Sequence, residues 1–393
     1  MKHLCRILCL FATLTLALSC TERRTANLQE FNVEIYTPDY AQGFKIVGAQ
    51  GLQSTIMQIE NPWQGAERVA HQLFIARGGE QVPAGFEGEV IEGDAERIIC
   101  MSSSHVAIFD AIGEVERVVG VSGMNYITND YVRSNRDIIG DVGQDSDANF
   151  ELIVALDPDI ILLYGITGAS SIEGKLRELG IPYAYIGEYL EEDPLGKTEW
   201  MVALAEIVGQ REKAEQIFKQ IPERYEALRT MAAAAPSPKP KVMINTPSPS
   251  PKPKVMINTP YADSWFMAST SSYVARLIAD AGGDYIYRRN TSNTSLPIDL
   301  EEAARLCAEA DVWINVGSIS SLDDMRRQFP KFADVPAVES GAVYNSDRRV
   351  HAEGGNDFWE SGMVNPDIIL RDMIKIFHPE LITEEFVYYR QLE

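Results

Sequence analysis

The stretch that decides the fold is GDVGQDSDANFELIVALDPDIILLYG, residues 140–165. It places a helical segment, FELIVAL, shortly before a continuous apolar run, DIILLYG. A strand written in Ile and Leu alone is buried on both faces, as in a parallel sheet that helices cover. The same alternation extends from RIICM at 97–101 to YAYIG at 183–187, which predicts a mostly parallel α/β lobe over residues 97–190.

Outside this lobe the sequence shows two other residue patterns before a second α/β series begins. Residues 31–90 alternate apolar and polar positions between turn residues, which predicts β-rich structure. Residues 197–235 are helix formers, interrupted only near Gly209 and Pro222, and predict a stiff spine. A second α/β series then begins at KVMINT and ends in a helix over 366–377.

We therefore expect an α/β protein of two Rossmann-like lobes joined by a long backbone helix, with a β-rich N-terminal segment. The predicted divisions are a signal peptide (1–20), a β-rich segment (21–95), an N-terminal lobe (96–195), a linker helix (196–235) and a C-terminal lobe (236–393).

The string SPKPKVMINTP occurs at 237–247 and again at 250–260. This period is too short for a solenoid or a propeller, so a local tandem duplication explains it. Two identical strands then compete for one place in the sheet. Because the second copy leads directly into residues 261–266, we expect the first copy, within 236–249, to loop out at small cost. A binding arm is the alternative interpretation.

The first twenty residues carry an export signal. Lys2 and Arg6 precede an apolar run, 7–18, which is too short for a permanent membrane span and ends at Ser19 and Cys20. A small residue before a cysteine resembles a bacterial lipoprotein signal, so we expect Cys20 to carry a lipid anchor. An ordinary cleaved signal is the alternative.

The remaining composition is that of an acidic globular protein. A hydrophobic content of 45% supplies a core, and a formal net charge of −22 argues against nucleic acid as a partner, because no basic patch can displace counterions from phosphates. Beyond the signal only Cys100 and Cys307 remain, and their apolar neighbours predict buried free thiols.

Several segments, taken in order, resemble one protein family. RIICMSSSHVAIFDAIGEVERVVGVSG precedes the stretch quoted first, KLRELGIPYAYIG follows it, and ADSWFMASTSSYVARLIADAGGDYIY leads to LPIDLEEAARL. Over residues 30–378 the chain resembles the class III periplasmic substrate-binding proteins, which have a rigid helical backbone and serve uptake of cobalamin, ferric siderophores and haem. The resemblance implies two α/β lobes with a ligand held in the cleft between them.

The resemblance also implies contact with an importer. In the cobalamin and siderophore binders, a glutamate near the start of one helix in each lobe meets arginines of the transporter. The matching positions are Glu151 in ANFELIV and Glu301 in IDLEEAA. A carboxylate in a first helical turn is favoured by the helix dipole and stays exposed for a partner. First-turn stabilisation alone is the alternative, and Glu302 competes with Glu301.

Ligand contacts are expected from loops at the strand ends that face the cleft. Aromatic rings beside small polar groups suit a flat, amphipathic chelate, although core packing is the competing explanation for each ring. The candidates are Ser103, Ser104, His105, Met124, Asn125, Tyr126, Tyr164, Trp265, Phe266, Asn356, Phe358 and Trp359.

Few histidines are available for a bare metal ion. His105 and His351, with Glu353 or Asp357, form the set that a bare-metal alternative can use, and His105 alone could contact an iron-bearing ligand. Adjacent Ser and His in Ser102–His105 do not make a nucleophile and base, and no GxSxG or nucleotide-binding motif occurs. We expect no enzymatic activity and no cofactor.

These patterns predict a monomeric, periplasmic, membrane-anchored lipoprotein that captures an iron complex, with a ferric siderophore preferred, and delivers it to the permease of an ABC importer. Haem or cobalamin is the alternative ligand. Transfer to an outer-membrane receptor is a further alternative, but residues 21–24 are not the acidic run of a surface-export signal. Because a long helical spine resists bending, we expect little closure of the lobes.

Overall fold

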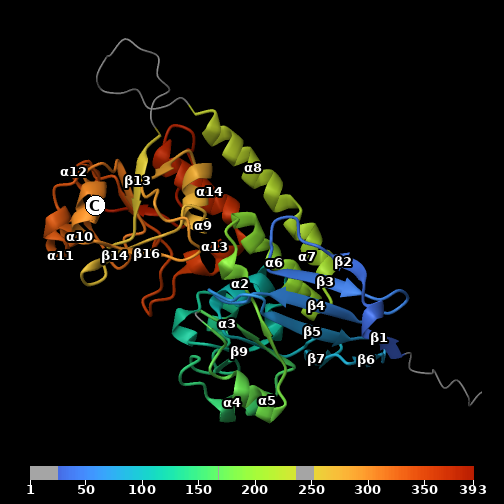
Figure 1. Ribbon diagram of the computed structural model, residues 1–393. Coiled ribbons are helices and arrows are strands. Elements are labelled where there is room, and N and C mark those ends of the chain that lie inside the picture. The colour runs from blue at the N-terminus through green and yellow to red at the C-terminus, as the bar shows by residue number, and fades with distance from the viewer. Residues whose placement is uncertain (1–24, 167, 236–251) are drawn as a thin grey trace, which may run out of the picture.

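The computed structural model describes residues 25–166, 168–235 and 252–393. Two α/β lobes and an additional N-terminal sheet make up the molecule, and a long helix runs along one side from lobe to lobe (Figure 1). The predicted two-lobed α/β class is thus confirmed. The signal peptide, Cys20 and the first copy of the repeated string lie outside the described residues. Within the described ranges, no helix has both the length and the apolar character that a membrane span requires.

The β-rich segment forms a five-stranded sheet of order β2-β3-β4-β5-β7. Its neighbours are antiparallel except for the parallel β5–β7 pair. Turn glycines and prolines separate strands whose apolar side chains pack toward the core. The strands are β1 (Thr25–Asn27), β2 (Val33–Tyr36), β3 (Phe44–Gly48), β4 (Thr55–Glu60), β5 (Ala70–Ala76), β6 (Gln81–Ala84) and β7 (Glu89–Glu92), with β1 paired to β6.

The N-terminal lobe contains a fully parallel sheet of order β10-β9-β8-β11-β12. All four side chains of the IILL strand are buried, as expected for a strand covered on both faces. Its strands are β8 (Ile98–Cys100), β9 (Val118–Val121), β10 (Gly140–Asp141), β11 (Ile160–Leu163) and β12 (Tyr183–Tyr185). Its helices are α2 (Ser103–Ala111), α3 (Asp130–Ser134), α4 (Phe150–Leu156) and α5 (Glu173–Leu179).

Three consecutive helices join the lobes. They are α6 (Pro194–Ile207), α7 (Arg211–Phe218) and α8 (Gln220–Ala233). Gly209 has a φ of 70° and separates α6 from α7, whereas Pro222 is accommodated in the first turn of α8. Almost every residue of α6 is buried, so α6 is a core helix, and α8 is the spine that spans the lobes in Figure 1.

The C-terminal lobe has a second five-stranded sheet, of order β15-β13-β17-β18-β19, which is parallel except for the β18–β19 pair. The antiparallel pair β14–β16 forms a separate two-stranded sheet. The second copy of the repeated string supplies β13. The strands are β13 (Lys254–Ile257), β14 (Ser264–Met267), β15 (Asp284–Tyr285), β16 (Leu296–Asp299), β17 (Val312–Ile314), β18 (Val343–Asn345) and β19 (Arg390–Gln391). The helices are α9 (Tyr273–Asp280), α10 (Leu300–Cys307), α11 (Leu322–Gln328), α12 (Pro336–Glu339), α13 (Ser361–Val364) and α14 (Pro366–Phe377). Cys100 and Cys307 are buried free thiols, as predicted.

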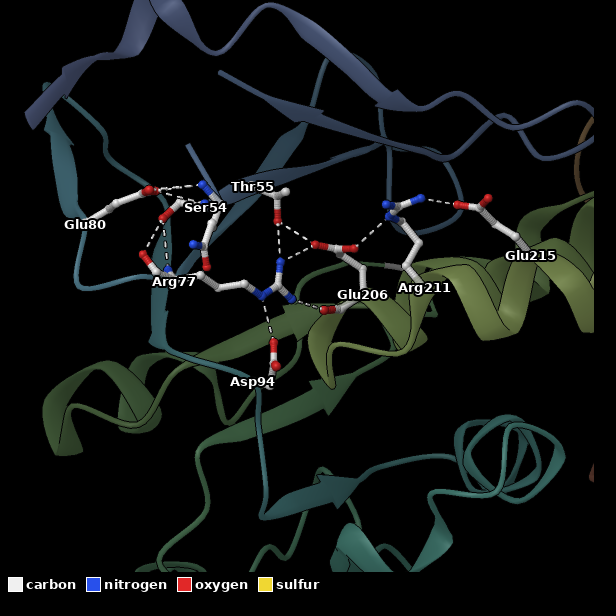
Figure 2. Close-up of polar contacts among 9 residues, drawn as sticks. Ser54, Thr55, Arg77, Glu80, Asp94, Glu206, Arg211 and Glu215 are labelled. Atoms are coloured by element: carbon white, nitrogen blue, oxygen red, sulfur yellow. Dashed lines mark hydrogen bonds and ion pairs between the residues drawn. The ribbon is translucent and has the colours of Figure 1, made fainter. Parts of the chain in front are cut away.

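An ion-pair network fastens the N-terminal sheet to the end of α6 (Figure 2). The guanidinium of Arg77, just after β5, lies 2.5 Å from Glu206 Oε1 and donates to the Glu206 carbonyl oxygen at 2.6 Å and to Asp94 at 2.7 Å. Arg211 Nε approaches the other Glu206 oxygen to 3.1 Å, and Thr55 donates to Glu206 at 2.7 Å. Glu206 is only 3% exposed, so its charge depends on these partners.

A second connection between the lobes, which we call the strap, is residues 349–364. It leaves the C-terminal lobe after β18, and its helix α13 packs on α2 and α6. Arg133 and Arg136 of the N-terminal lobe form ion pairs with Glu353 at 3.2 and 2.7 Å. Thr198 Oγ1 of α6 donates to the carbonyl oxygen of Met363 at 2.7 Å. The spine and the strap together fix the spacing of the lobes.

Two buried carboxyl groups of the strap hold Thr128 of the N-terminal lobe. Its backbone N–H donates to Glu360 Oε2 at 2.7 Å, and its hydroxyl donates to Asp357 Oδ1 at 3.0 Å. Burial, opposed by these hydrogen bonds, raises the pKa of Glu360 to about 7, and the neighbouring Asp357 charge acts in the same direction as burial. Glu360 therefore titrates near neutrality in the folded protein.

Replacing Glu360 by Gln is expected to remove a pH dependence of stability. The folded pKa lies above the ordinary value of 4.5, so the stabilising effect of the bound proton is complete below pH 4.5 and is lost as the pH rises through 7. We expect Glu360→Gln to exceed the wild type in unfolding free energy by about 3 kcal/mol at pH 8 and to match it near pH 4.5. Urea denaturation at both pH values measures this, with the exposed Asp323→Asn as control. Equal differences at both pH values would refute the assignment.

Candidate functional site

A cleft opens where the two lobes, the N-terminal sheet and the strap meet. It has an outer chamber of about 570 Å³ and an inner pocket of about 180 Å³. Both are lined by Tyr189, Lys197, Tyr273 and Trp359, so the two spaces adjoin. Tyr189 follows β12 of the N-terminal lobe, Lys197 lies on α6, Tyr273 begins α9 and Trp359 belongs to the strap. Elements far apart in sequence thus converge on one site.

Aromatic rings and uncharged polar groups dominate the outer chamber. Trp63 joins the three aromatic residues that line both spaces, and Trp359 is 58% exposed toward solvent. Rings of this kind provide apolar contact for the face of a flat ligand. The uncharged polar lining consists of Gln42, Asn61, Gln64, Ser269, Ser272, Asn293, Thr294 and Ser295.

The acidic side chains of the cleft are held by the fold. Glu191 accepts hydrogen bonds from the backbone N–H groups of Gln42 and Gly43 at 2.9 Å and from Trp200 Nε1 at 3.0 Å. Burial raises the pKa of Glu191, and these donors oppose the rise. Glu192 accepts from Ser271 of the opposite lobe at 2.5 Å. Glu191 therefore anchors the β2–β3 loop beside the cleft.

Lys197 is the one cation among the described residues that line the cleft. Its Nζ lies 4.9 Å from the centre of the Tyr273 ring, in a cation–π contact. Burial lowers the pKa of Lys197, while the charges of Glu188 and Glu191 raise it. Lys197 is half-buried, and it lines both spaces of the cleft.

The inner pocket begins at the N-terminus of α2. Ser102 caps the helix, and Ser104 Oγ donates to Glu188 Oε1 at 2.6 Å. His105 lies behind them, completely buried, with Nε2 3.9 Å from Glu188 Oε2. Burial lowers the pKa of His105, which favours the neutral imidazole. Both ring nitrogens lack a hydrogen-bond partner in the described structure.

Four of the predicted ligand contacts line the cleft: Ser103, Ser104, Phe358 and Trp359. His105 does not, because its side chain points into the core below Ser104. The residues placed outside the cleft lining are Met124, Asn125, Tyr126, Tyr164, Trp265, Phe266 and Asn356.

Two of these residues have clear structural roles. Trp265 is fully buried, donates from Nε1 to the carbonyl oxygen of Ile257 at 2.9 Å, and packs against Trp313 and Phe332. Asn356 caps the short helix that follows it and donates to the carbonyl oxygen of Ser346 at 3.0 Å. Core packing and capping, rather than the cleft, account for these positions.

The structure does not bring together the side chains that the bare-metal alternative would need. His351 lines a separate cavity of about 730 Å³ beside α8, together with Asp357, whereas His105 is buried behind the inner pocket. Within the described ranges, no group of three or more His, Cys, Asp or Glu side chains is close enough to hold a metal ion. That larger cavity is lined by Arg224 and Arg349, each already paired with an aspartate.

The two glutamates proposed to meet the importer are accessible. Glu151 lies in the first turn of α4 after the cap Asn149, and Glu301 lies in the first turn of α10 after the cap Asp299. Both are exposed, and neither forms an ion pair with another described residue. Glu302, the competitor, is engaged by Arg289 at 2.9 Å and Arg305 at 3.6 Å.

Comparison with known proteins gives concordant results. The family model described as periplasmic binding protein matches residues 98–350. An uncharacterized lipoprotein of Methanocaldococcus jannaschii is 28% identical over 349 residues, which are 82% of this chain and 78% of the relative. A cobalamin-binding protein of Halobacterium salinarum is 22% identical over 234 residues, which are 59% of this chain and 57% of that protein.

Solved structures share the fold. A periplasmic heme-binding protein from Pseudomonas aeruginosa aligns with a TM-score of 0.57 and 18% identity, over 76% of this chain and 98% of that one. The periplasmic heme-binding protein RhuT from Roseiflexus sp. RS-1 aligns with a TM-score of 0.52 and 19% identity, over 73% of this chain and 100% of that one. The match of the family model across both lobes shows that the chain belongs to the periplasmic binding protein family, of class III type, whose members bind solutes and are not enzymes.

Proposed function

We propose that this protein captures a metal chelate with an uncharged, amide-bearing edge, a corrinoid in the first place, and delivers it to the permease of an ABC importer. The observation that carries the choice of ligand is the charge of the cleft. The described lining contains one cationic side chain, Lys197, and three acidic ones, Glu188, Glu191 and Glu192. Such a site disfavours ligands that carry several negative charges.

This criterion separates the chelates that the family takes up. Haem carries two carboxylates, and a ferric tris-catecholate carries a larger negative charge, so each would need more than one cation to compensate it. A corrinoid instead presents amide groups around a flat ring. The amides and hydroxyls of the outer chamber can donate to and accept from such an edge, and the rings of Trp63 and Trp359 can cover its faces.

The relatives are consistent with this choice. The Halobacterium salinarum protein is named for cobalamin binding, although it matches little more than half of either chain. Among siderophores, a ferric hydroxamate is the second candidate, because it too lacks the high negative charge of a catecholate complex. This narrows the initial expectation of a ferric siderophore by the charge of the site.

The chemistry can be tested by retention of a coloured ligand. We expect residues 21–393, mixed with cyanocobalamin and then desalted, to keep the corrinoid absorption near one equivalent. Haemin and a ferric tris-catecholate, whose negative charges the cleft disfavours, are the negative controls and are expected to pass through. Retention of haemin in preference to cyanocobalamin would overturn the proposal.

The location is part of the same proposal. An anchor on Cys20 would hold the carrier at the membrane surface, within reach of the importer. Support comes from the export signal in the sequence and from a relative named as a lipoprotein. Glu151 and Glu301, one on each lobe, are the proposed contacts with arginines of the permease, and a monomer presents both.

A further inference from the structure

Lys197 is a cation that the fold leaves unpaired. Within the described structure its Nζ makes neither a hydrogen bond nor an ion pair, and its recorded neighbour is the Tyr273 ring. Glu191 accepts from backbone amides and Trp200, and Glu188 accepts from Ser104 through one oxygen, while Glu188 Oε2 has no hydrogen-bond partner in the described structure. An ammonium group carries three donors, and burying them without acceptors is costly. Lys197 is half-buried and lines the cleft, so its donors are available to an acceptor that enters there.

A second open donor lies in the same pocket. Ser103 lines the inner pocket beside Lys197, and its hydroxyl has no hydrogen-bond partner among the described residues. The neighbouring hydroxyl of Ser104 is already used by Glu188. Phe358 and Met363 line the same pocket, together with Ser102, Ser104 and Glu188. Two unused donors thus face one space of about 180 Å³.

We infer that the inner pocket receives one side arm of the ligand and that Lys197 and Ser103 donate hydrogen bonds to an oxygen on that arm. The pocket is too small for a chelate ring, and it adjoins the larger chamber that suits one. The inference rests on the proposed corrinoid function. In that class the oxygen belongs either to an amide of the ring edge or to the phosphodiester of the nucleotide loop.

Lys197 is then the residue that selects among related ligands. A ligand that fills the outer chamber but has no oxygen-bearing arm would cover the half-buried ammonium without giving it an acceptor, and the site would bind this ligand more weakly. Glu188 behind the pocket adds negative charge, so an arm with more than one negative charge is also disfavoured.

The test compares Lys197→Met with Lys197→Arg, using Lys175→Met as the control. Lys175 is an exposed lysine of α5, paired with Glu178 and not part of the cleft lining. Affinities for cyanocobalamin and for dicyanocobinamide, which lacks the nucleotide loop, are measured by titration calorimetry. We expect Lys197→Met to weaken binding about 10- to 100-fold, Lys197→Arg to retain most of it, and Lys175→Met to match the wild type.

The pair of ligands identifies the oxygen. A loss with both points to a ring-edge amide, and a loss with cyanocobalamin alone points to the phosphodiester. Lys197→Met binding both as the wild type does would overturn the inference while leaving the proposed function intact. The melting temperature of Lys197→Met should equal or exceed that of the wild type, because a half-buried charge without an ion-pair partner is removed, so a folding defect would be visible separately.

A wild-type protein that retains neither corrinoid refutes the proposed ligand class instead. The same variants are then compared with the ferric complex of desferrioxamine B, which also offers amide oxygens. Dependence on Lys197 there would support the arm pocket without the corrinoid, and no difference between the variants, or no binding at all, would overturn it.

Discussion

Reversing both Glu151 and Glu301 to lysine is expected to abolish uptake of the ligand by cells while leaving its binding affinity nearly unchanged. Both side chains are exposed in first helical turns, one on each lobe, and neither is paired with another described residue. Two lysines would place like charges against the arginines proposed for the permease, and such contacts cost several kcal/mol in association. Uptake of labelled ligand in cells and calorimetry on the purified protein measure the two quantities.

The control is a second double variant with the same change in net charge. Glu116 and Glu339 are exposed acidic residues, one in each lobe, away from the two helix starts. Glu116→Lys with Glu339→Lys should leave uptake near the wild-type level. If the Glu151 and Glu301 reversals also leave uptake intact, docking through these glutamates is wrong. If instead ligand affinity collapses, the two residues act on the cleft and not on the importer.

Replacing Arg77 by methionine is expected to lower the unfolding free energy by about 3–5 kcal/mol, the usual effect of breaking a buried ion pair. Glu206 would keep Arg211 and Thr55 but lose the closer guanidinium, and Asp94 would lose its partner. Because the network in Figure 2 joins the N-terminal sheet to α6, we also expect the sheet to detach more easily. Urea denaturation and hydrogen exchange of β4 and β5 measure the two effects.

Lys45→Met provides the matched control. Lys45 is also on the N-terminal sheet, but its side chain is 47% exposed and lies 4.0 Å from an exposed Glu60. Removal of such a surface pair should change stability by less than about 1 kcal/mol. Similar losses for both variants would show that the burial of Glu206 is not what gives the Arg77 contacts their strength.

The arrangement of layers could be predicted from the sequence because a strand buried on both faces consists of consecutive apolar residues. The IILL run of β11 and the helical run before it are local patterns, and they were sufficient for the parallel sheet. The family resemblance placed the cleft between two lobes. The helical region could also be predicted. The sequence did not show that α6 is buried while α8 is the spine, because both helices consist of similar helix-forming residues.

The cleft lining was harder to predict because it depends on contacts between distant segments. Lys197 lies in a stretch with the pattern of a linker helix, and Trp63 lies in a segment that resembles a separate sheet. Conversely, we expected Trp265 to lie just after a strand, as a ligand contact would, but it lies within β14 and fills the core beside Trp313. Residue type and position after a strand do not say which side of the sheet end a side chain occupies.

The double connection between the lobes has a kinetic consequence. Because spine and strap hold the lobes at one spacing, the empty and the loaded carrier would present nearly the same outer faces to an importer. Empty copies would then occupy docking sites as readily as loaded ones, and the transport rate would follow the loaded fraction of the carrier rather than its total amount. A cell using such a carrier gains little by making more of it than its supply of ligand can fill.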